Sequence, residues 1–323
     1  MTERFRILSL DGGGIKGAFT ASVVAALEED AGKSMADYFD LITGTSTGGI
    51  IALGLGLGLP AKDIVAFYQQ HGPTIFPCTS LVSRWSGFFR WLTGPKHSHQ
   101  VLKAALKQVL GDRKLGESKC RLVIPTYDAN AGRIFLLKTA HHERFKYDYQ
   151  APMVDVALAT AAAPTYFRAA PFPTHQNASY VDGGVWANCP ALVGITEAVG
   201  FLNVPLEQID VLSIGTTAEP FSIAQHKDSG VVQWNAGLIN LMFEAQVQAD
   251  VAQAKVLVGG RMHRINHMAP AGQFSLDNAT PEKIEELVSL GRGEAVKKEN
   301  IEVVRRMFLN ETLAEKFLPC YRV

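Results

Sequence analysis

The sequence has few cysteines, and they are scattered. Its four cysteines are Cys78, Cys120, Cys189 and Cys320, and no two of them form a CxxC pair. This spacing excludes the common structural zinc motifs and gives no sign of a disulfide framework. We therefore expect free thiols in a reducing compartment, and no residue pattern calls for a bound metal or a cofactor.

An excess of charge of either sign is also missing. Lysine and arginine total 31, aspartate and glutamate total 31, and the formal net charge is zero. A neutral chain lacks the bulk electrostatic attraction that holds nucleic-acid polymers, and it carries no polybasic membrane anchor. With 47% hydrophobic and 19% charged residues, its composition is typical of an ordinary globular protein with a sizeable core.

Long hydrophobic runs are absent too. The longest, GGIIALGLGLGLP at Gly48–Pro60, is interrupted by glycines and is shorter than the roughly 18 residues that span a bilayer. The first residues, MTERFRILSL, are too short in their apolar part for a signal peptide. We expect a soluble cytoplasmic protein that contacts membranes only peripherally.

Strand-like and helix-like segments alternate along the chain. This alternation predicts an α/β layered fold with a mostly parallel sheet. The expected strands are 5–10, 38–44, 121–127, 133–138, 178–184, 209–215 and 262–266. The expected helices are 16–30, 50–59, 61–71, 100–110, 154–162, 231–257 and helical material from 281 to 307. No internal repeat or linker divides the chain, so we expect a single domain over residues 1–323.

A glycine-rich loop follows the first strand. Gly12-x-Gly14-x-x-Gly17 has the spacing of a dinucleotide-binding loop, which also requires an acidic residue where the second strand ends. The nearest acid, Asp40, lies instead at the start of that strand, and no P-loop motif follows. The loop is therefore predicted to hold a negative charge other than a pyrophosphate.

The second strand runs into a nucleophile-elbow pattern. Gly44-x-Ser46-x-Gly48 lies between an apolar strand and an apolar helix, where a serine on a tight turn tolerates only small neighbours. Acyl transfer to a serine needs backbone amides aimed at the developing oxyanion, and glycines let the backbone come close. The amides of Gly12, Gly13 and Gly14 are the candidates for that oxyanion hole.

A serine nucleophile also needs a base. Asp182, followed by Gly183 in YVDGGVWANCP, comes at the end of an apolar strand and is presented by an open turn. Spacing alone favours an ordinary Asp-Gly turn aspartate over a catalytic one. The alternative base is a histidine in a Ser-Asp-His triad, for which His226 in the polar stretch AQHKDSG is the candidate.

Four motifs in order, DGGGIKG, GTSTGG, AAAPTYF and DGG, resemble those of the patatin-like phospholipases, and the resemblance covers at least Phe5 to Val199. It implies a three-layer α/β/α sandwich and a lipid acyl hydrolase that uses a Ser-Asp dyad without histidine. Ser46 would then be the nucleophile, Asp182 its base and Gly12, Gly13 and Gly14 the oxyanion hole. Lys16 stands at the basic position of the family's first motif.

An aromatic segment is a candidate cap. Within residues 73–100, TSLVSRWSGFFRWLTG at Thr79–Gly94 carries tryptophan, phenylalanine and arginine, so it could be a core helix or an amphipathic segment at a lipid surface. A helical cap over the catalytic domain is the expected architecture.

The resemblance extends to substrate and control. It implies membrane phospholipid as the substrate, and the compact size is similar to that of bacterial members that serve as anti-phage effectors activated by a cyclic di- or trinucleotide. Candidate cations for that activator are Arg84, Arg90, Lys96 and Lys103, although each taken singly is more simply a solvated surface charge. A small-ester esterase and a nucleotide-sensing protein with little lipase activity stay open as alternatives. The oligomeric state stays open as well, a homo-oligomer included.

Overall fold

The protein is an α/β sandwich in a computed structural model that describes residues 4–76, 98–164, 166–176, 178–219 and 231–323. The strands are β1 (Phe5–Leu10), β2 (Leu41–Gly44), β3 (Arg121–Asp128), β4 (Arg133–Lys138), β5 (Ala170–Phe172), β6 (Ala178–Asp182), β7 (Ile209–Ile214) and β8 (Met262–Ile265). The helices are α1 (Gly17–Ala31), α2 (Thr47–Leu57), α3 (Ala61–Ile75), α5 (His99–Leu110), α6 (Met153–Thr160), α7 (Gly184–Ala187), α8 (Ala191–Phe201), α9 (Val231–Val258), α10 (Pro281–Val296) and α11 (Lys298–Met307).

The sheet is mixed, with a parallel centre. Its strand order is β5-β6-β3-β2-β1-β7-β8, and β4 pairs with β3 off this path. The pairs β3–β2, β2–β1, β1–β7 and β7–β8 are parallel, whereas β6 runs antiparallel to β3. The carboxyl ends of β1 and β2 therefore meet at one edge of the sheet, next to the end of β6. Ligand sites in such sheets form at this edge.

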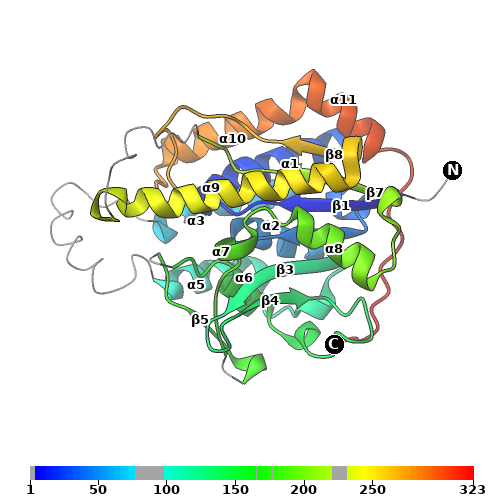
Figure 1. The fold of residues 1–323 in the computed structure, drawn as a ribbon, viewed down its shortest axis with the longest axis horizontal. Helices are drawn as coiled ribbons and strands as arrows, with labels where there is room; N and C mark the ends of the chain where they lie inside the picture. Colours follow the sequence, from blue (N-terminus) through cyan, green and yellow to red (C-terminus); the bar gives the residue numbers. More distant parts are fainter. Residues whose placement is uncertain (1–3, 77–97, 165, 177, 220–230) are drawn as a thin grey trace.

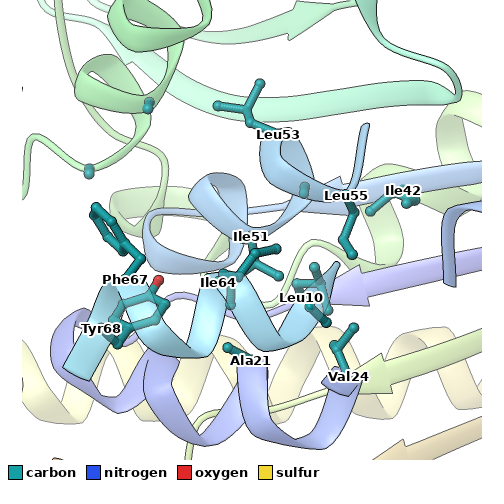
Figure 2. Close-up of a cluster of buried hydrophobic side chains, with 14 of the residues drawn as sticks. Leu10, Ala21, Val24, Ile42, Ile51, Leu53, Leu55, Ile64, Phe67 and Tyr68 are labelled. Atoms are coloured by element: carbon teal, nitrogen blue, oxygen red, sulfur yellow. The ribbon is translucent and has the colours of Figure 1, made fainter. Parts of the chain in front are cut away.

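Helices cover both faces of the sheet, so the fold has the three layers that the family resemblance implies (Figure 1). Alternate residues of β1 belong to different cores, because successive side chains point to opposite faces of a strand. Leu8 and Leu10 pack with α1, α2 and α3 (Figure 2), and Ile7 packs with α8 and the end of α9. Figure 1 shows α9 lying along the second of these faces.

The expected elements are largely confirmed, with several differences. The strand expected at 178–184 ends at Asp182, because Gly184 begins the short helix α7. The second strand begins at Leu41 and not at Tyr38, since residues 35–37 form a short 3-10 helix that ends at Tyr38. The helical material at 281–307 is two helices, because the backbone of Lys297 is extended (ψ 136°) between them. The helix Ala191–Phe201 and the short strand Ala170–Phe172 were not predicted.

The expected cap lies almost wholly outside the described residues. Of the interval 73–100, the structure describes the last residues of α3 with Phe76, and residues from 98 onward at the start of α5. The aromatic segment 79–94 is therefore not placed. No helix among the described residues is both long enough and apolar enough to cross a bilayer.

Candidate active site

Ser46 occupies a strained turn between β2 and α2. Its φ of 55° and ψ of −121° are rarely adopted by a non-glycine residue. The turn is possible because its neighbours are glycines: a Cβ on Gly44 would lie 2.2 Å from the Gly48 carbonyl oxygen, and one on Gly48 would lie 2.2 Å from the Leu10 oxygen. The GxSxG pattern thus has a steric cause at both flanking positions, and the helix α2 begins directly after Ser46.

Asp182, the last residue of β6, is buried beside this turn. Its Oδ1 accepts a hydrogen bond of 2.7 Å from the Gly184 amide, and the Ser46 hydroxyl lies close enough to the carboxylate to act on its pKa. Burial raises the pKa of Asp182 to about 7, against the lowering effect of the Gly184 amide and the Ser46 hydroxyl. The structure therefore brings the two residues into a Ser-Asp pair whose carboxyl has the basicity that a proton acceptor needs near neutral pH.

The glycine after Asp182 has no room for a side chain. A Cβ on Gly183 would lie 2.3 Å from the carbonyl oxygen of Pro125 on β3. The close approach lets the chain turn away at the end of β6, and it leaves Asp182 pointing toward Ser46. The Asp-Gly turn thus reverses the chain and also orients the Asp182 carboxylate toward Ser46.

The end of α6 holds both members of the pair. The Ser46 amide donates to Thr160 Oγ1 at 3.0 Å, and this hydroxyl donates in turn to the Pro125 carbonyl at 2.8 Å. Two residues later, the Ala162 carbonyl accepts from the Asp182 amide at 3.0 Å. Thr160 is fully buried, so solvent does not compete for these two hydrogen bonds of its hydroxyl. Residues 160–162 therefore position Ser46 and Asp182 relative to each other.

The glycine loop lies against Ser46. A Cβ on Gly12 would be 3.3 Å from the Ser46 Cβ and 2.3 Å from Asn188 Oδ1, so only glycine fits. The Gly12 amide donates to the Asn188 carbonyl at 2.9 Å. The amides of Gly13 and Gly14, in contrast, donate no hydrogen bond within the described part of the chain. These two amides are available to an oxyanion, and Gly12 provides the close approach.

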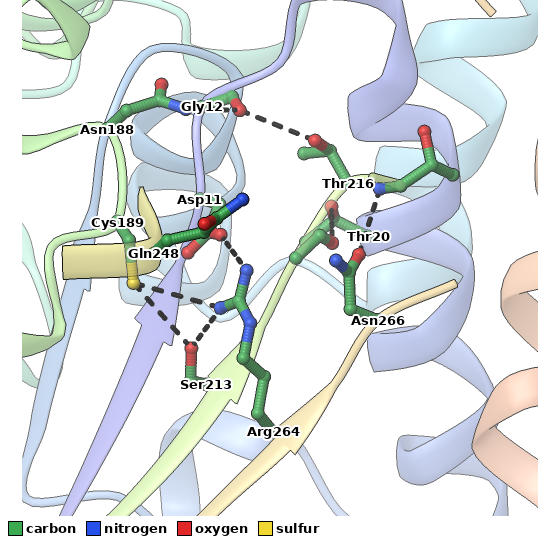
Figure 3. A network of polar contacts seen from close by, with 12 residues as sticks. Asp11, Gly12, Thr20, Asn188, Cys189, Ser213, Thr216, Gln248, Arg264 and Asn266 are labelled. Atoms are coloured by element: carbon green, nitrogen blue, oxygen red, sulfur yellow. Dashed lines mark hydrogen bonds and ion pairs between the residues drawn. The ribbon is translucent and has the colours of Figure 1, made fainter. Parts of the chain in front are cut away.

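A buried polar network fixes the loop from behind (Figure 3). Asp11, which precedes the loop, forms an ion pair of 2.6 Å with Arg264 of β8, and Arg264 also donates to Ser213 of β7 at 2.6 Å. The Gly12 carbonyl accepts long bonds of 3.4 Å from Asn188 Nδ2 and Thr216 Oγ1. Burial acts to lower the pKa of the Arg264 guanidinium, but the Asp11 carboxylate keeps that pKa raised. The loop is therefore held by β7, β8 and the α7–α8 connection together.

These residues line one cavity of about 380 Å³. Its apolar part, which we call the acyl arm, is lined by Ile50, Tyr68, Ile75, Phe76, Leu102 and Phe167. Its polar part, which we call the polar arm, is lined by Lys16, Thr217, Glu219 and Glu244. Ser46, Asp182 and all three loop glycines line it as well. An amphiphile with one apolar and one charged end matches this division.

No histidine lines the cavity among the described residues. His263 bonds to Asn300 at 3.0 Å and His267 pairs with Glu294 at 2.7 Å, both away from Ser46. His226 lies outside the described residues, and so do Cys78, Arg84, Arg90 and Lys96. In the part of the chain that the structure covers, no cluster of three or more His, Cys, Asp or Glu side chains could hold a metal ion.

Lys103 lies on α5, where its Nζ is 3.8 Å from Asp155 and its side chain is largely exposed. It does not line the cavity. The residues that sequence reasoning missed are Thr160, Asn188, Thr217, Glu219, Glu244 and Arg264. None belongs to a motif with a chemical signature, although Thr160 directly precedes AAAPTYF, so only the folded chain identifies them.

The chain was compared with protein families, with curated proteins and with solved structures. The family model for patatin-like phospholipases matches residues 8–195. A cGAMP-activated phospholipase of Pseudomonas aeruginosa is 36% identical over 89% of this chain and 83% of its own. A second protein of that description, from Vibrio cholerae, is 31% identical over 90% of each chain. The crystal structure of VipD from Legionella pneumophila matches 93% of this chain and 67% of its own at a TM-score of 0.49 and 14% identity.

Proposed function

The chain belongs to the patatin-like phospholipase family, a family of hydrolases, and from this premise we propose that it cleaves fatty-acyl esters of membrane phospholipids with Ser46 as nucleophile and Asp182 as its base. The observation that carries the proposal is the pair itself. A serine on a strained turn lies beside a buried carboxylate whose pKa is raised to about 7.

The first half of the reaction forms an acyl-enzyme. The Ser46 oxygen attacks the ester carbonyl carbon while its proton passes to the Asp182 carboxylate. The carbonyl oxygen becomes an oxyanion, which the amides of Gly13 and Gly14 stabilise. When this intermediate collapses, the bond to the glycerol oxygen breaks, and that oxygen takes the proton from Asp182 as the lysophospholipid leaves.

The second half restores the enzyme. A water molecule gives a proton to Asp182 and attacks the acyl carbon, which forms a second oxyanion in the same place. Collapse breaks the bond to Ser46, whose oxygen recovers the proton from Asp182, and the fatty acid is released. One carboxylate thus serves as base and then as acid in each half, a double role that a pKa near neutrality supports.

The test is fatty-acid release from vesicles that contain phosphatidylethanolamine and phosphatidylglycerol. Ser46→Ala should abolish release and leave the melting temperature close to that of the wild type, since its small side chain still fits the turn. Ser289→Ala, an exposed position on α10, is the matched control and should keep full activity. Full activity in Ser46→Ala would overturn the assignment.

We propose in addition that a cyclic oligonucleotide switches the enzyme on, as in the effector proteins of anti-phage signalling. The support is that the Pseudomonas and Vibrio relatives are both described as cGAMP-activated. An activator made inside the cell would place the enzyme in the cytoplasm, from which it would meet the bilayer peripherally. The assay is therefore run with and without cGAMP. Release that requires both Ser46 and cGAMP supports the switch, and equal release in both conditions contradicts it.

The two alternatives give different results. A Ser-Asp-His esterase would lose activity in His226→Ala, whereas a Ser-Asp dyad would keep it. A nucleotide-sensing protein with little lipase activity would gain thermal stability from cGAMP and release no fatty acid under any condition.

A further inference from the structure

The polar arm of the cavity carries more charge than ester hydrolysis requires. The charged residues that line the cavity are Asp11, Lys16, Asp182, Glu219, Glu244 and Arg264. Asp182 belongs to the catalytic pair, and Asp11 and Arg264 neutralise one another at 2.6 Å. This leaves one cation, Lys16, facing the same space as two carboxylates, Glu219 and Glu244. A substrate group that enters the arm meets both signs of charge.

Lys16 is placed next to the loop that would hold the oxyanion. It ends the short 3-10 helix Gly14–Lys16, and its Nζ donates to the Thr217 carbonyl at 3.1 Å. That is its one hydrogen bond among the described residues, although an ammonium group has three donors. Burial lowers its pKa, whereas Glu219, Glu244 and Asp11 act to raise it, in keeping with their position around the same cavity.

Two polar atoms of the cavity wall, one of them in the polar arm, have no hydrogen-bond partner among the described residues. Thr217 is 5% exposed, and its buried Oγ1 has no hydrogen-bond partner within the described chain. The φ of Thr217 is 118°, which is strained for a β-branched side chain. Asp11 Oδ1, nearer the glycine loop, is likewise buried and unpartnered. Orphaned groups and backbone strain in a cavity wall are typical of a site that a ligand completes.

The two carboxylates are held differently. The Glu219 carboxylate accepts hydrogen bonds from the backbone amides of Gly272 at 2.7 Å and Phe274 at 3.1 Å. These bonds fix Glu219 against the loop after β8. Glu244 projects from α9 and accepts only an exposed bond from Gln248 at 3.2 Å among the described residues. Glu219 is therefore a fixed negative charge of the arm, and Glu244 is a movable one.

We propose that the polar arm is a headgroup subsite that selects phospholipids whose headgroup carries an ammonium group, with phosphatidylethanolamine as the substrate. This rests on the proposed lipid hydrolysis. The phosphate of the headgroup interacts with Lys16 and the Thr217 hydroxyl, and the ammonium interacts with Glu219 and Glu244. Phosphatidylglycerol offers the same phosphate without a cation, so the two carboxylates repel it without compensation.

The experiment is internal competition in one vesicle. Phosphatidylethanolamine and phosphatidylglycerol with the same acyl chains are mixed in equal amounts, and the acyl chains of the phosphatidylglycerol carry an isotope label. After cGAMP is added, the mass of each released fatty acid shows from which lipid it came. Because both substrates share one membrane, their ratio does not depend on how well the enzyme binds the vesicle or how far it is activated. The wild type should favour phosphatidylethanolamine by about tenfold, the size of one charge interaction across a partly solvated site.

Three variants connect this preference to the carboxylates. Glu244→Gln should bring the ratio toward one, and Glu244→Lys should favour phosphatidylglycerol. Glu282→Gln removes an exposed carboxylate of α10 outside the cavity and should leave the ratio unchanged. Glu219→Gln should act like Glu244→Gln, and because its amide contacts could matter for folding, Glu244 is the primary test.

The outcomes separate this inference from the proposed function. A wild type that releases neither fatty acid, like Ser46→Ala, overturns the lipase itself. A wild type that releases both equally, or a preference that Glu244→Lys does not change, overturns the headgroup subsite and leaves the lipase intact. A preference that Glu282→Gln removes as well would show a surface-charge effect and would also overturn the subsite.

Discussion

Replacing Asp182 by Asn should make the protein inactive and, at alkaline pH, more stable. Asn keeps the shape of the side chain and the oxygen that accepts the Gly184 amide, but it cannot take the Ser46 proton. It also removes the need to bury a negative charge. The two effects have the same origin, since the burial that raises the pKa is the burial that opposes ionisation.

The pKa of Asp182 is raised from 3.8 to about 7, so the unfolded chain ionises this carboxyl far more readily than the folded one. Between these two values the folded state binds more protons, and its free energy of unfolding falls as the pH rises. Each pH unit corresponds to about 1.4 kcal/mol, which gives an upper limit of about 4 kcal/mol lost by pH 8. The side-chain amide of the Asp182→Asn variant is neutral at every pH, so the variant loses no stability through this group.

The assay compares the urea midpoints of the wild type and Asp182→Asn at pH 5, 6, 7 and 8.5. The advantage of the variant should grow with pH and level off above pH 7. Wild-type turnover should rise through the same range, because only the ionised carboxylate accepts the proton from Ser46. An Asp182→Asn protein that is less stable at pH 8.5, or whose advantage does not change with pH, would refute the assignment of a buried carboxyl with a raised pKa.

Three further changes have defined outcomes. Thr160→Val removes the hydroxyl that accepts the Ser46 amide, and leaving that buried amide without a hydrogen bond costs about 1–3 kcal/mol. We therefore expect kcat to fall at least tenfold in Thr160→Val and to be restored in Thr160→Ser. An unchanged kcat would contradict the positioning role of Thr160. Glu197→Gln leaves the buried Lys138 ammonium without its partner at 2.6 Å, and urea denaturation should show a loss of about 3–5 kcal/mol with kcat retained in the folded protein. Ala163→Phe narrows the cavity that Ala163 lines. In a series of substrates with acyl chains of increasing length, each methylene that no longer fits should lower kcat/KM about fourfold. Equal losses for short and long acyl chains would refute the acyl arm.

The parts of the fold that the sequence predicts are those with local causes. The strands Phe5–Leu10 and Ile209–Ile214 are buried apolar runs, and the elbow around Ser46 depends on glycines a few residues away. The helix Ala191–Phe201 was missed because its ALVGITEAVGF sequence is apolar nearly all round and includes a glycine that packs against Ile7. Such a segment has no helical periodicity to detect, and it is helical because both the sheet and α9 cover it.

The site shows the same division between local and long-range causes. Motifs identify Ser46, Asp182 and the glycine loop, but they do not show that the Gly12 amide is already engaged by Asn188, a residue 176 positions away. The raised pKa of Asp182 is likewise absent from the sequence, where Asp-Gly is most simply a turn. Burial raises the pKa of Asp182, and the burial of this side chain depends on how the layers of the fold pack together.

The cavity adds a final step to this reasoning. The wall that carries Ser46, Asp182 and the glycine loop comes from the ends of β1, β2 and β6, which are the elements that carry the motifs, whereas Glu219 follows β7 and Glu244 projects from α9. The proposed chemistry and the proposed headgroup selection are therefore located on different parts of the chain. A change at Glu244 can alter which headgroup is accepted without moving Ser46 or Asp182, because no described hydrogen bond joins it to either.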